Sequence, residues 1–517
     1  MKQFIFICLL FATFQSINGQ NLAPVISGFN VSVDAPNSSA SLFYILNDAE
    51  NDPLEVIVQF SKDGGKTYTT LESPDISGDI GFPVSSGIRT ATCQNLDFSQ
   101  PLKYVFRLIA DDLQTFDIQA LVDQVDSTRL RNDLTFIEGI RHNSTGLNHL
   151  NETRDSISRL FNNQNLHFEN QSFPIGNLIG QNLIGTNPGT DSADQVVIVD
   201  AHYDTVANAP GADDNGSGTV GVMEIARLLS QYPSKKTQRY IGFDLEELGR
   251  LGSINYVNNG IPASESIKGV FNFEMIGYWS DQPNSQSLPT GFGLLFPLQT
   301  QEVANNQYRG DFITNVGNDA SNSLGLLFSQ AAQQYVPGLK VISLAVPGNG
   351  SLAPDLRRSD HASFWDGNHQ ALMLTDGANF RNECYHTPSD TLDEKLNFTF
   401  MSNVVKATLA AMAELVDIQH GDWATTAYDL SSGTHEPLPC SFHWLPGNRL
   451  MLQGEGCLEG EYTIELYDIS GKQLMSRNVN LNIGVNNAID LPSLPAGIYL
   501  AKLGGENTFY TQKIQIH

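Results

Sequence analysis

Acidic and histidine side chains stand directly after several short apolar runs in the middle of the chain. The runs are "VVIVD", "YIGFDL", "GVFNF" and "ALMLTD", each of strand length. The side chains that follow them are, in chain order, His202, Asp204, Glu246, Glu247, Glu274 and His386. Because binding residues gather at the carboxyl edge of a parallel sheet, we expect these groups to meet there. Imidazole and carboxylate groups are ligands of zinc in proteins.

The stretch "GADDNGSG", residues 211–218, follows the first of these runs and sets two adjacent acids among glycines. Glycine permits unusual backbone dihedrals and a close approach of the backbone. A short acid in such a turn, at the start of a helix, is held rigidly enough to bridge two metal ions. Two imidazoles, two terminal carboxylates and one shared carboxylate suit a pair of zinc ions, so the pattern predicts a two-zinc site.

These motifs resemble the co-catalytic two-zinc exopeptidase family, which includes bacterial leucyl aminopeptidases, glutamate carboxypeptidase and glutaminyl cyclase. The stretches that carry the resemblance occur in family order: "AHYDTV", "GADDNGSG", "DLEELGRLGS", "FEMIGY", "RSDHASFW" and "YHTPSDT". The resemblance implies that His202, Asp214 and Glu274 bind one zinc ion. It implies that Glu247 and His386 bind the other, with Asp214 shared between the two.

The resemblance also implies roles for residues that do not bind metal. Glu246 matches the general base of the family, and Asp204 matches the acid that orients the imidazole of the first histidine. Tyr385 matches a tyrosine that hydrogen-bonds the tetrahedral oxyanion in some members. The family pattern further implies a cis peptide bond between Asp214 and Asn215.

Two features depart from the family pattern. Glu274 stands where the best-known aminopeptidases have aspartate, and "PDLRR" stands where leucyl aminopeptidases carry a cysteine pair around a tyrosine. In that stretch Arg357 and Arg358 either meet an acidic side chain or a free carboxylate of the substrate, or remain solvated. His361, a few residues later, either contacts the substrate or has a structural role.

The elements that must position these residues belong to an α/β fold. From residue 119 to 419 apolar runs of strand length alternate with helical periodicity, as at Leu130, Leu134 and Ile137. This alternation predicts a mainly parallel, mixed sheet with helices on both faces, of the zinc exopeptidase type. A β-sandwich-like module of the fibronectin or immunoglobulin kind is predicted before it, at 21–117, and a linker after it, at 420–439.

The last part of the chain, residues 440–517, reads as a second β-module. Its "DISGKQL" and "AGIYLAKL" resemble the C-terminal domain that directs proteins through type IX secretion, although a carbohydrate-binding or structural β-module remains an alternative. Residues 1–19 read as a secretory signal peptide. We therefore expect a protein that is secreted or held at the cell surface after the signal peptide is removed.

The net charge of the chain excludes some classes of partner, and its cysteine content bears on disulfide bonds. The chain has 56 Asp and Glu residues and 29 Lys and Arg residues, which give a net charge of −27. This charge repels nucleic acid and anionic membranes. No run after the signal peptide is long enough for a transmembrane helix. In an exported chain disulfides are plausible, and we favour Cys440 with Cys457, which leaves Cys93 and Cys384 as partners or as free thiols.

Together these features predict a secreted aminopeptidase that holds two zinc ions per chain and hydrolyses N-terminal residues from peptides. Glu246 would act as general base on a water between the metals. Three alternatives remain: a glutaminyl cyclase, a carboxypeptidase or dipeptidase of the same family, and a catalytically inactive surface binding protein. The type IX secretion machinery is the expected partner for export.

Overall fold

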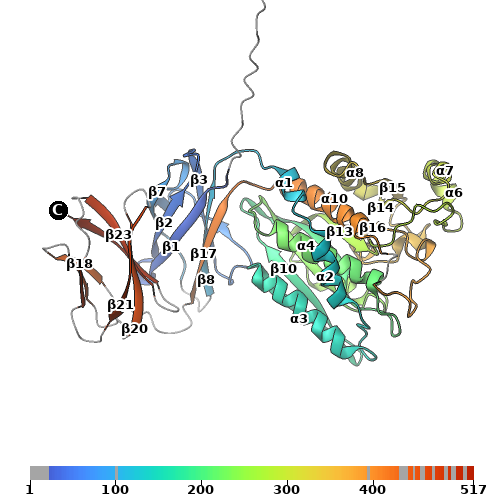
Figure 1. Ribbon diagram of the computed structural model, residues 1–517, viewed down its shortest axis with the longest axis horizontal. Helices are drawn as coiled ribbons and strands as arrows, with labels where there is room; N and C mark the ends of the chain where they lie inside the picture. Colours follow the sequence, from blue (N-terminus) through green and yellow to red (C-terminus); the bar gives the residue numbers. More distant parts are fainter. Residues whose placement is uncertain are drawn as a thin grey trace, which may run out of the picture.

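The computed structural model describes residues 22–98, 103–392 and 396–429, together with strands of the C-terminal part. Along the sequence a β-sandwich, an α/β domain and a second β-module follow one another, and in the molecule the β-sandwich lies between the other two (Figure 1). This is the predicted fold class, with a mixed sheet flanked by two β-modules.

The first module is built from two antiparallel sheets that face each other. One sheet has the order β1-β2-β7-β5, and the other has the order β17-β8-β3-β4, with β6 beside β3. The strands of the first sheet are β1 (Val25–Asp34), β2 (Ser39–Asn47), β5 (Ile76–Gly78) and β7 (Gly87–Cys93), with a turn η1 (Ala35–Asn37) between β1 and β2. Those of the second are β3 (Leu54–Ser61), β4 (Thr69–Thr70), β6 (Gly81–Val84), β8 (Lys103–Asp111) and β17 (Asp422–Asp429). Alternate residues of both sheets, such as Tyr44 and Val58, fill the core between them.

Strand β17 corrects the predicted linker at 420–439. Residues 422–429 pair antiparallel with β8 over its whole length, so the chain returns to the first module after the α/β domain. Trp423, Thr425 and Ala427 alternate with Ala424 and Tyr428, and the latter two pack against the sandwich core. The pairing partner lies more than 300 residues earlier in the sequence, as the register of Asp422 with Ala110 shows, and no local pattern identifies it.

An eight-stranded mixed sheet forms the centre of the second domain, in the order β15-β14-β16-β13-β11-β12-β10-β9. Strands β16, β13, β11 and β12 run parallel, which brings their carboxyl ends to one edge. The strands are β9 (His167–Ile175), β10 (Leu178–Asn187), β11 (Ser192–His202), β12 (Lys236–Phe243), β13 (Ser266–Glu274), β14 (Ile313–Asn318), β15 (Val341–Val346) and β16 (Ala371–Thr375). Side chains of β11 alternate between two cores: Val197 and Val199 face one, Val196 and Ile198 the other.

Helices cover both faces of this sheet, as predicted. The larger core lies under α1 (Ile118–Val122), α2 (Ser127–Ile137), α3 (Leu147–Asn163), α4 (Gly218–Leu229), α8 (Asn322–Tyr335) and α10 (Phe398–Val416). The smaller core lies under α5 (Leu251–Asn259), α6 (Phe292–Leu295), α7 (Pro297–Asn305) and α9 (His361–Asp366). Short helical turns are η2 (Ala212–Ser217), η3 (Asp319–Ser321), η4 (Pro354–Arg357) and η5 (Ala378–Phe380). Helix α2 buries Leu130, Leu134 and Ile137, the face that periodicity predicted.

The C-terminal module contains two antiparallel sheets among the described strands. Their orders are β18-β19-β22 and β21-β20-β23-β24. The strands are β18 (Ser441–Leu445), β19 (Arg449–Gln453), β20 (Gly460–Tyr467), β21 (Gln473–Leu481), β22 (Asn487–Asp490), β23 (Gly497–Gly504) and β24 (Phe509–Ile516). Ile464 and Leu466, two residues apart on β20, are fully buried, as expected for one face of a strand.

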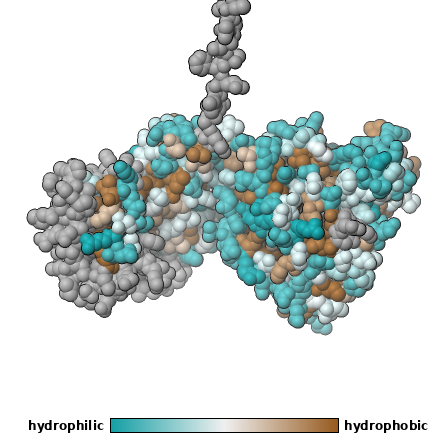
Figure 2. All heavy atoms as spheres, viewed as in Figure 1, coloured by the Kyte–Doolittle hydropathy of each residue, from teal (hydrophilic) through white to brown (hydrophobic). Residues whose placement is uncertain are grey.

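Several predicted features fall outside the described residues or concern the surface. The signal peptide and the favoured Cys440–Cys457 bond lie outside the described part of the chain. Cys93 lies on β7 and Cys384 in the α/β domain, and no disulfide joins them. Within the described ranges no helix is long and apolar enough to cross a membrane. On the face shown in Figure 2, hydrophilic residues cover most of the α/β domain.

Arg107 on β8 joins the first module to the α/β domain. Its side chain is buried, and its guanidinium lies between the rings of Tyr68 and Trp423, at 4.1 and 4.8 Å from their centroids. Its Nη atoms donate to the carbonyl oxygens of Pro188 and Gly189 at 2.8 and 2.9 Å. These contacts tie β8 and β17 to the loop that leaves β10, so the module is fixed to the domain by charge-assisted hydrogen bonds.

We expect Arg107→Leu to lower the free energy of unfolding by about 3 kcal/mol, because two buried carbonyls lose their donor. Lys103→Leu, an equally apolar change at an exposed position of the same strand, should leave it within about 0.5 kcal/mol of the parent. Denaturant unfolding followed by fluorescence checks both variants. Equal stability of the two would show that the guanidinium does not anchor the module.

Candidate metal centre

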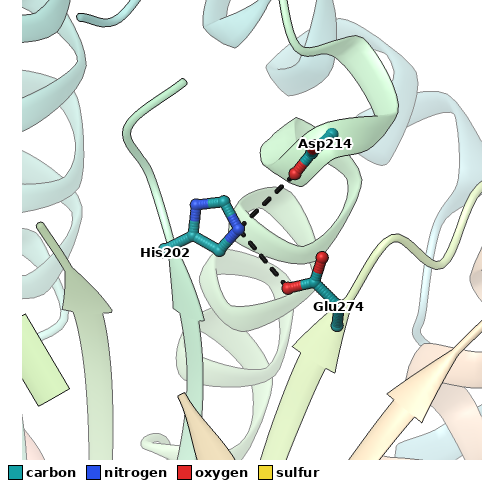
Figure 3. A group of neighbouring side chains, drawn as sticks. All are labelled: His202, Asp214 and Glu274. Atoms are coloured by element: carbon teal, nitrogen blue, oxygen red, sulfur yellow. Dashed lines mark ion pairs between the residues drawn. The ribbon is translucent and has the colours of Figure 1, made fainter. Parts of the chain in front are cut away.

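Three buried side chains meet at the carboxyl edge of the sheet (Figure 3). His202 ends β11, Glu274 ends β13, and Asp214 lies in η2, the turn that leads into α4. The Nε2 atom of His202 lies 3.5 Å from Asp214 Oδ1 and 3.4 Å from Glu274 Oε2. The three ligand atoms thus surround one small volume.

A second group shares Asp214 with the first. The Nε2 atom of His386 lies 3.1 Å from Asp214 Oδ2 and 3.2 Å from Glu247 Oε2. Glu247 follows β12, and His386 follows β16 and η5. The two oxygens of one carboxylate therefore face two different histidines, which is the geometry that a bridging ligand requires.

The donor atoms of both groups fit divalent cations. Within each group the ligand atoms lie within 4.8 Å of one another. Two buried oxygens, Asp214 Oδ2 and Glu247 Oε1, have no hydrogen-bond partner. A buried carboxylate oxygen without a donor is costly, and a cation between these oxygens and the imidazoles would offset that cost. Imidazole and carboxylate ligands in sets of three suit zinc with a position left open.

Backbone geometry in "GADDNGSG" presents Asp214 to both groups. Gly211 has φ +64°, and a Cβ there would lie 2.3 Å from the carbonyl oxygen of Asp214, so no other residue fits. The peptide bond between Asp214 and Asn215 is cis, as the family resemblance implied. Asp390 accepts the N–H groups of Asp213 and Asp214, each at 3.0 Å, and so fixes the bend from the opposite side.

The other polar side chains of this turn hold the chain that leaves β13. Three consecutive N–H groups, those of Met275, Ile276 and Gly277, donate to the turn. Their acceptors are Asn215 Oδ1 at 3.1 Å, Ser217 Oγ at 3.0 Å and Asp213 Oδ1 at 3.0 Å. Asp213 therefore fixes the backbone beside Glu274. Sequence analysis assigned it no role, because residue type alone does not distinguish it from the adjacent Asp214.

Asp204 positions more than the imidazole for which it was predicted. Its Oδ1 lies 3.5 Å from Nδ1 of His202, whose closer partner is the Asp204 carbonyl oxygen at 3.2 Å. Both carboxylate oxygens also accept backbone N–H groups, from Glu246 at 3.0 Å and from Glu247 at 3.2 Å. One carboxylate thus sets the position of a histidine and of the adjacent glutamate pair.

Glu246 and Tyr385 lie beside the two groups without belonging to either. Burial, with the neighbouring acids, raises the pKa of Glu246 well above its usual range, although the charge of His202 opposes this. The ring of Tyr385 stacks on that of His386, with centroids 3.8 Å apart and planes at 17°. Leu245 and His386 adopt left-handed backbone conformations, at φ 56° and 58°. Non-glycine residues in this region are uncommon and cluster at functional sites.

The "RSDHASFW" segment contributes through residues that the sequence left open. Ser359 Oγ donates to Glu274 Oε2 at 2.8 Å in the buried centre. His361 is fully buried, donates from Nε2 to the Leu356 carbonyl oxygen at 3.0 Å, and packs edge-on against Trp365. Burial lowers the pKa of His361 to about 3, so this imidazole is neutral. Its contacts favour the predicted structural role over contact with the substrate.

Arg141 is a supporting residue that sequence reasoning missed. Its buried guanidinium donates to five carbonyl oxygens, those of Ile137, Gly139, Tyr203, Pro210 and Gly211. These bonds hold the loop between His202 and Asp214 against α2. A single arginine far upstream carries no local signal of this contact.

Charge in the centre is unevenly balanced without cations. Burial disfavours the charged imidazole of His386, yet the carboxylates of Asp214 and Glu247, at 3.1 and 3.2 Å from its Nε2, outweigh burial and raise its pKa to about 10. Burial and the nearby Asp214 carboxylate raise the pKa of Glu247 to about 7. Protons therefore occupy this centre in the metal-free protein at neutral pH.

Comparisons with known proteins agree on one family for the α/β domain. The profile described as Peptidase family M28 matches residues 182–412, and that described as Secretion system C-terminal sorting domain matches residues 448–517. The uncharacterized protein YfbL of Escherichia coli is 30% identical over 277 residues, which are 52% of this chain and 80% of that protein.

Two further relatives carry functional names. Aminopeptidase YwaD of Bacillus subtilis is 45% identical over 103 residues, 20% of this chain and 23% of that protein, so the match spans less than a quarter of YwaD. A probable zinc metalloprotease of Pyricularia oryzae is 24% identical over 383 residues, which are 65% of this chain and 74% of that protein.

Zinc uptake should release protons, and the apparent affinity should rise with pH. Because the pKa of His386 is about 10 in the metal-free protein, its imidazole carries a proton below that pH, and the proton must leave before Nε2 can bind a cation. We expect the affinity to increase by about tenfold per pH unit between roughly pH 8 and 9, and more steeply below about pH 7, where Glu247 also carries a proton. Calorimetric titration in two buffers of different ionisation enthalpy measures the protons released. Identical heats in both buffers would contradict this assignment.

Proposed function

Because this chain belongs to peptidase family M28, we propose that it is a zinc-dependent aminopeptidase that hydrolyses N-terminal residues from peptides. The observation that carries the proposal is the shared carboxylate of Asp214, whose two oxygens face His202 and His386 separately. The relative named an aminopeptidase and the relative named a zinc metalloprotease support the reaction and the metal.

Each zinc ion would be held by three protein ligands. His202, Asp214 and Glu274 would bind one ion; Asp214, Glu247 and His386 would bind the other. When bound, two such ions acidify a water and polarise the carbonyl of the scissile amide. The glutamate at 274 in place of aspartate keeps its carboxylate in reach, because Ser359 holds its Oε2 at 2.8 Å.

Glu246 would act as the general base. The hydrogen bond from its backbone N–H to Asp204 fixes the loop beside the centre, and its carboxyl is buried among His202, Glu274 and Asp360. A carboxylate in this environment accepts a proton from the attacking water and then delivers it to the leaving amine. Tyr385 would donate its hydroxyl hydrogen bond to the carbonyl oxygen as that oxygen gains negative charge.

An apolar pocket beside Glu274 and Tyr385 would receive the side chain of the N-terminal residue. Its apolar walls belong to the smaller core or pack against it, and include Leu288, Phe292, Val303, Phe312, Ile342, Leu344 and Met373. Among the described residues that line it, the acids are Glu274 and Asp355, the latter in the η4 turn. Such walls favour a large apolar side chain over a small or charged one.

The alternatives within the family are less well supported. A glutaminyl cyclase needs only one zinc ion, and the second group of Glu247 and His386 would then have no purpose. An inactive binding protein is expected to lack part of the ligand set, and every predicted ligand takes part in one of the two groups. The sorting domain supports export by type IX secretion to the outside or the surface of the cell, with the signal peptide removed on the way.

Glu246→Gln should lower kcat by at least about 1000-fold for leucyl-p-nitroanilide, because the isosteric amide cannot accept the proton of the attacking water. The variant should still bind two zinc ions, since its carboxylate lies in neither group of ligands. Glu383→Gln makes the same chemical change at an exposed position near His386 and should retain full activity. Metal analysis and steady-state kinetics check this, and an active Glu246→Gln enzyme would refute the proposed base.

Substrate preference should follow the pocket. We expect kcat/KM to be about 30-fold higher for a leucyl than for an alanyl anilide, since burying the additional carbons contributes roughly 2 kcal/mol. An acetylated leucyl anilide should not be cleaved by an aminopeptidase. Equal rates for alanyl and leucyl substrates would exclude this pocket as the binding site for the first side chain.

A further inference from the structure

Adjacent arginines in "PDLRR" point to different partners. Arg357 lies on η4, where it donates to the Asn349 carbonyl and pairs with Asp366 at 2.6 Å, a contact at the end of α9. Arg358 follows η4 and lines the apolar pocket together with Glu274 and Tyr385. Sequence analysis treated Arg357 and Arg358 alike, as residues that either meet an acidic group of the substrate or remain solvated. The structure gives them different surroundings.

The guanidinium of Arg358 is held in a defined position beside Tyr385. Its Nη2 donates to the Tyr385 hydroxyl oxygen at 2.8 Å, and its Nη1 donates to Asn379 Oδ1 at 2.8 Å. Its central carbon lies 5.3 Å from the centroid of the Tyr385 ring. Because a guanidinium is planar and rigid, the bond to Asn379 fixes the direction in which Arg358 donates to the Tyr385 hydroxyl. A lysine ammonium, which rotates freely, would fix that direction less well.

The Tyr385 ring is fixed on its other side by the metal centre. It stacks on His386, and His386 lies 3.1 Å from the shared Asp214 oxygen. Stacking on His386 fixes the plane of the Tyr385 ring, and the bond from Arg358 fixes its oxygen. The hydroxyl hydrogen can still rotate about the C–O bond. Since one lone pair of the phenol oxygen receives the Arg358 N–H, the hydroxyl hydrogen is left to point to the remaining side.

We propose that Arg358 is a positioning residue for the reaction: it fixes Tyr385 so that the hydroxyl donates into the metal centre, toward the carbonyl oxygen of the bound substrate. This inference rests on the proposed function and deepens it. The positive charge next to the phenol oxygen also makes the hydroxyl a stronger donor, in the way that charge-assisted networks do.

A role for Arg358 in binding a substrate carboxylate fits the contacts less well. Both Nη atoms already have acceptors, and Asp355 lies 3.8 Å from Nη1, close enough to neutralise part of the charge. An incoming carboxylate would have to compete with Asp355 and displace Asn379. The pocket behind Arg358 is apolar, which does not suit an acidic side chain.

The test measures kcat and KM for leucyl-p-nitroanilide with the zinc-loaded full chain and its variants. Tyr385→Phe should lower kcat by about 100-fold, as loss of one donor to a developing oxyanion does. Arg358→Met should lower kcat by about tenfold and change KM by less than about twofold. The double variant should be no slower than Tyr385→Phe alone within about twofold, because both changes remove one interaction.

Two further variants separate positioning from folding. Arg358→Lys, which keeps the charge and a donor, should recover part of the loss in kcat. Arg357→Met, with its partners away from the centre, should retain the parent kcat. Zinc content and melting temperature of Arg358→Met should equal those of Arg357→Met.

The outcomes are distinct. Multiplicative losses in the double variant would overturn the inference, as would a rise in KM confined to substrates with an acidic side chain or a free carboxylate, which would assign Arg358 to substrate binding. An inactive parent chain that holds its zinc would overturn the proposed function and this inference together. An active parent with independent effects of the two substitutions would overturn the inference alone.

Discussion

The site depends on one constraint: the Asp214 carboxylate must be buried and yet keep both oxygens open toward different histidines. One of these oxygens accepts no hydrogen bond, and Glu247 and Glu274 stand within reach of the same imidazoles. Burial, and next the Asp214 carboxylate, raise the pKa of Glu247. This shift indicates that several charged acids in a buried site raise the free energy of the metal-free protein. Two divalent cations placed between these groups would turn that cost into metal affinity, so the folded chain and the metals stabilise each other.

The acids near the site fall into two groups: some accept hydrogen bonds from the backbone, and the others point their oxygens toward the histidines. Asp390, Asp213 and Asp204 each accept main-chain N–H groups, at the bend of η2, after β13 and after β12, and the second oxygen of Asp213 accepts from the Asn382 side chain. These bonds fix loops that carry Asp214, Glu274 and the glutamate pair. Because their oxygens already accept hydrogen bonds, these acids would not compete for metal ions, and their contacts would hold the proposed ligands in place.

Much of the fold followed from the sequence, and the confirmed family and sorting tail followed from motifs. Residues at strand ends were predictable because parallel strands present their carboxyl ends to one edge, which is where His202 and Glu274 lie. The contact of Asp213 with the backbone was not predictable, because its partner Gly277 lies 64 residues away and shows no pattern of its own. Strand β17 was read as linker for the same reason: edge strands are specified by a distant partner, here β8. The ligand roles and the domain limits remain predictions.

One short segment connects the apolar pocket to the metal centre. Leu356 lines the pocket, Arg358 binds the Tyr385 hydroxyl, and Ser359 binds Glu274, all within four residues of the chain from 356 to 359. His361 anchors the same segment in the core through the Leu356 carbonyl. If Tyr385 and Glu274 have the proposed roles, a substrate side chain in this pocket would contact the segment that positions both of them. In the proposed enzyme, binding energy from the first side chain would then help to align the reacting groups, so that the choice of substrate and the rate depend on the same segment.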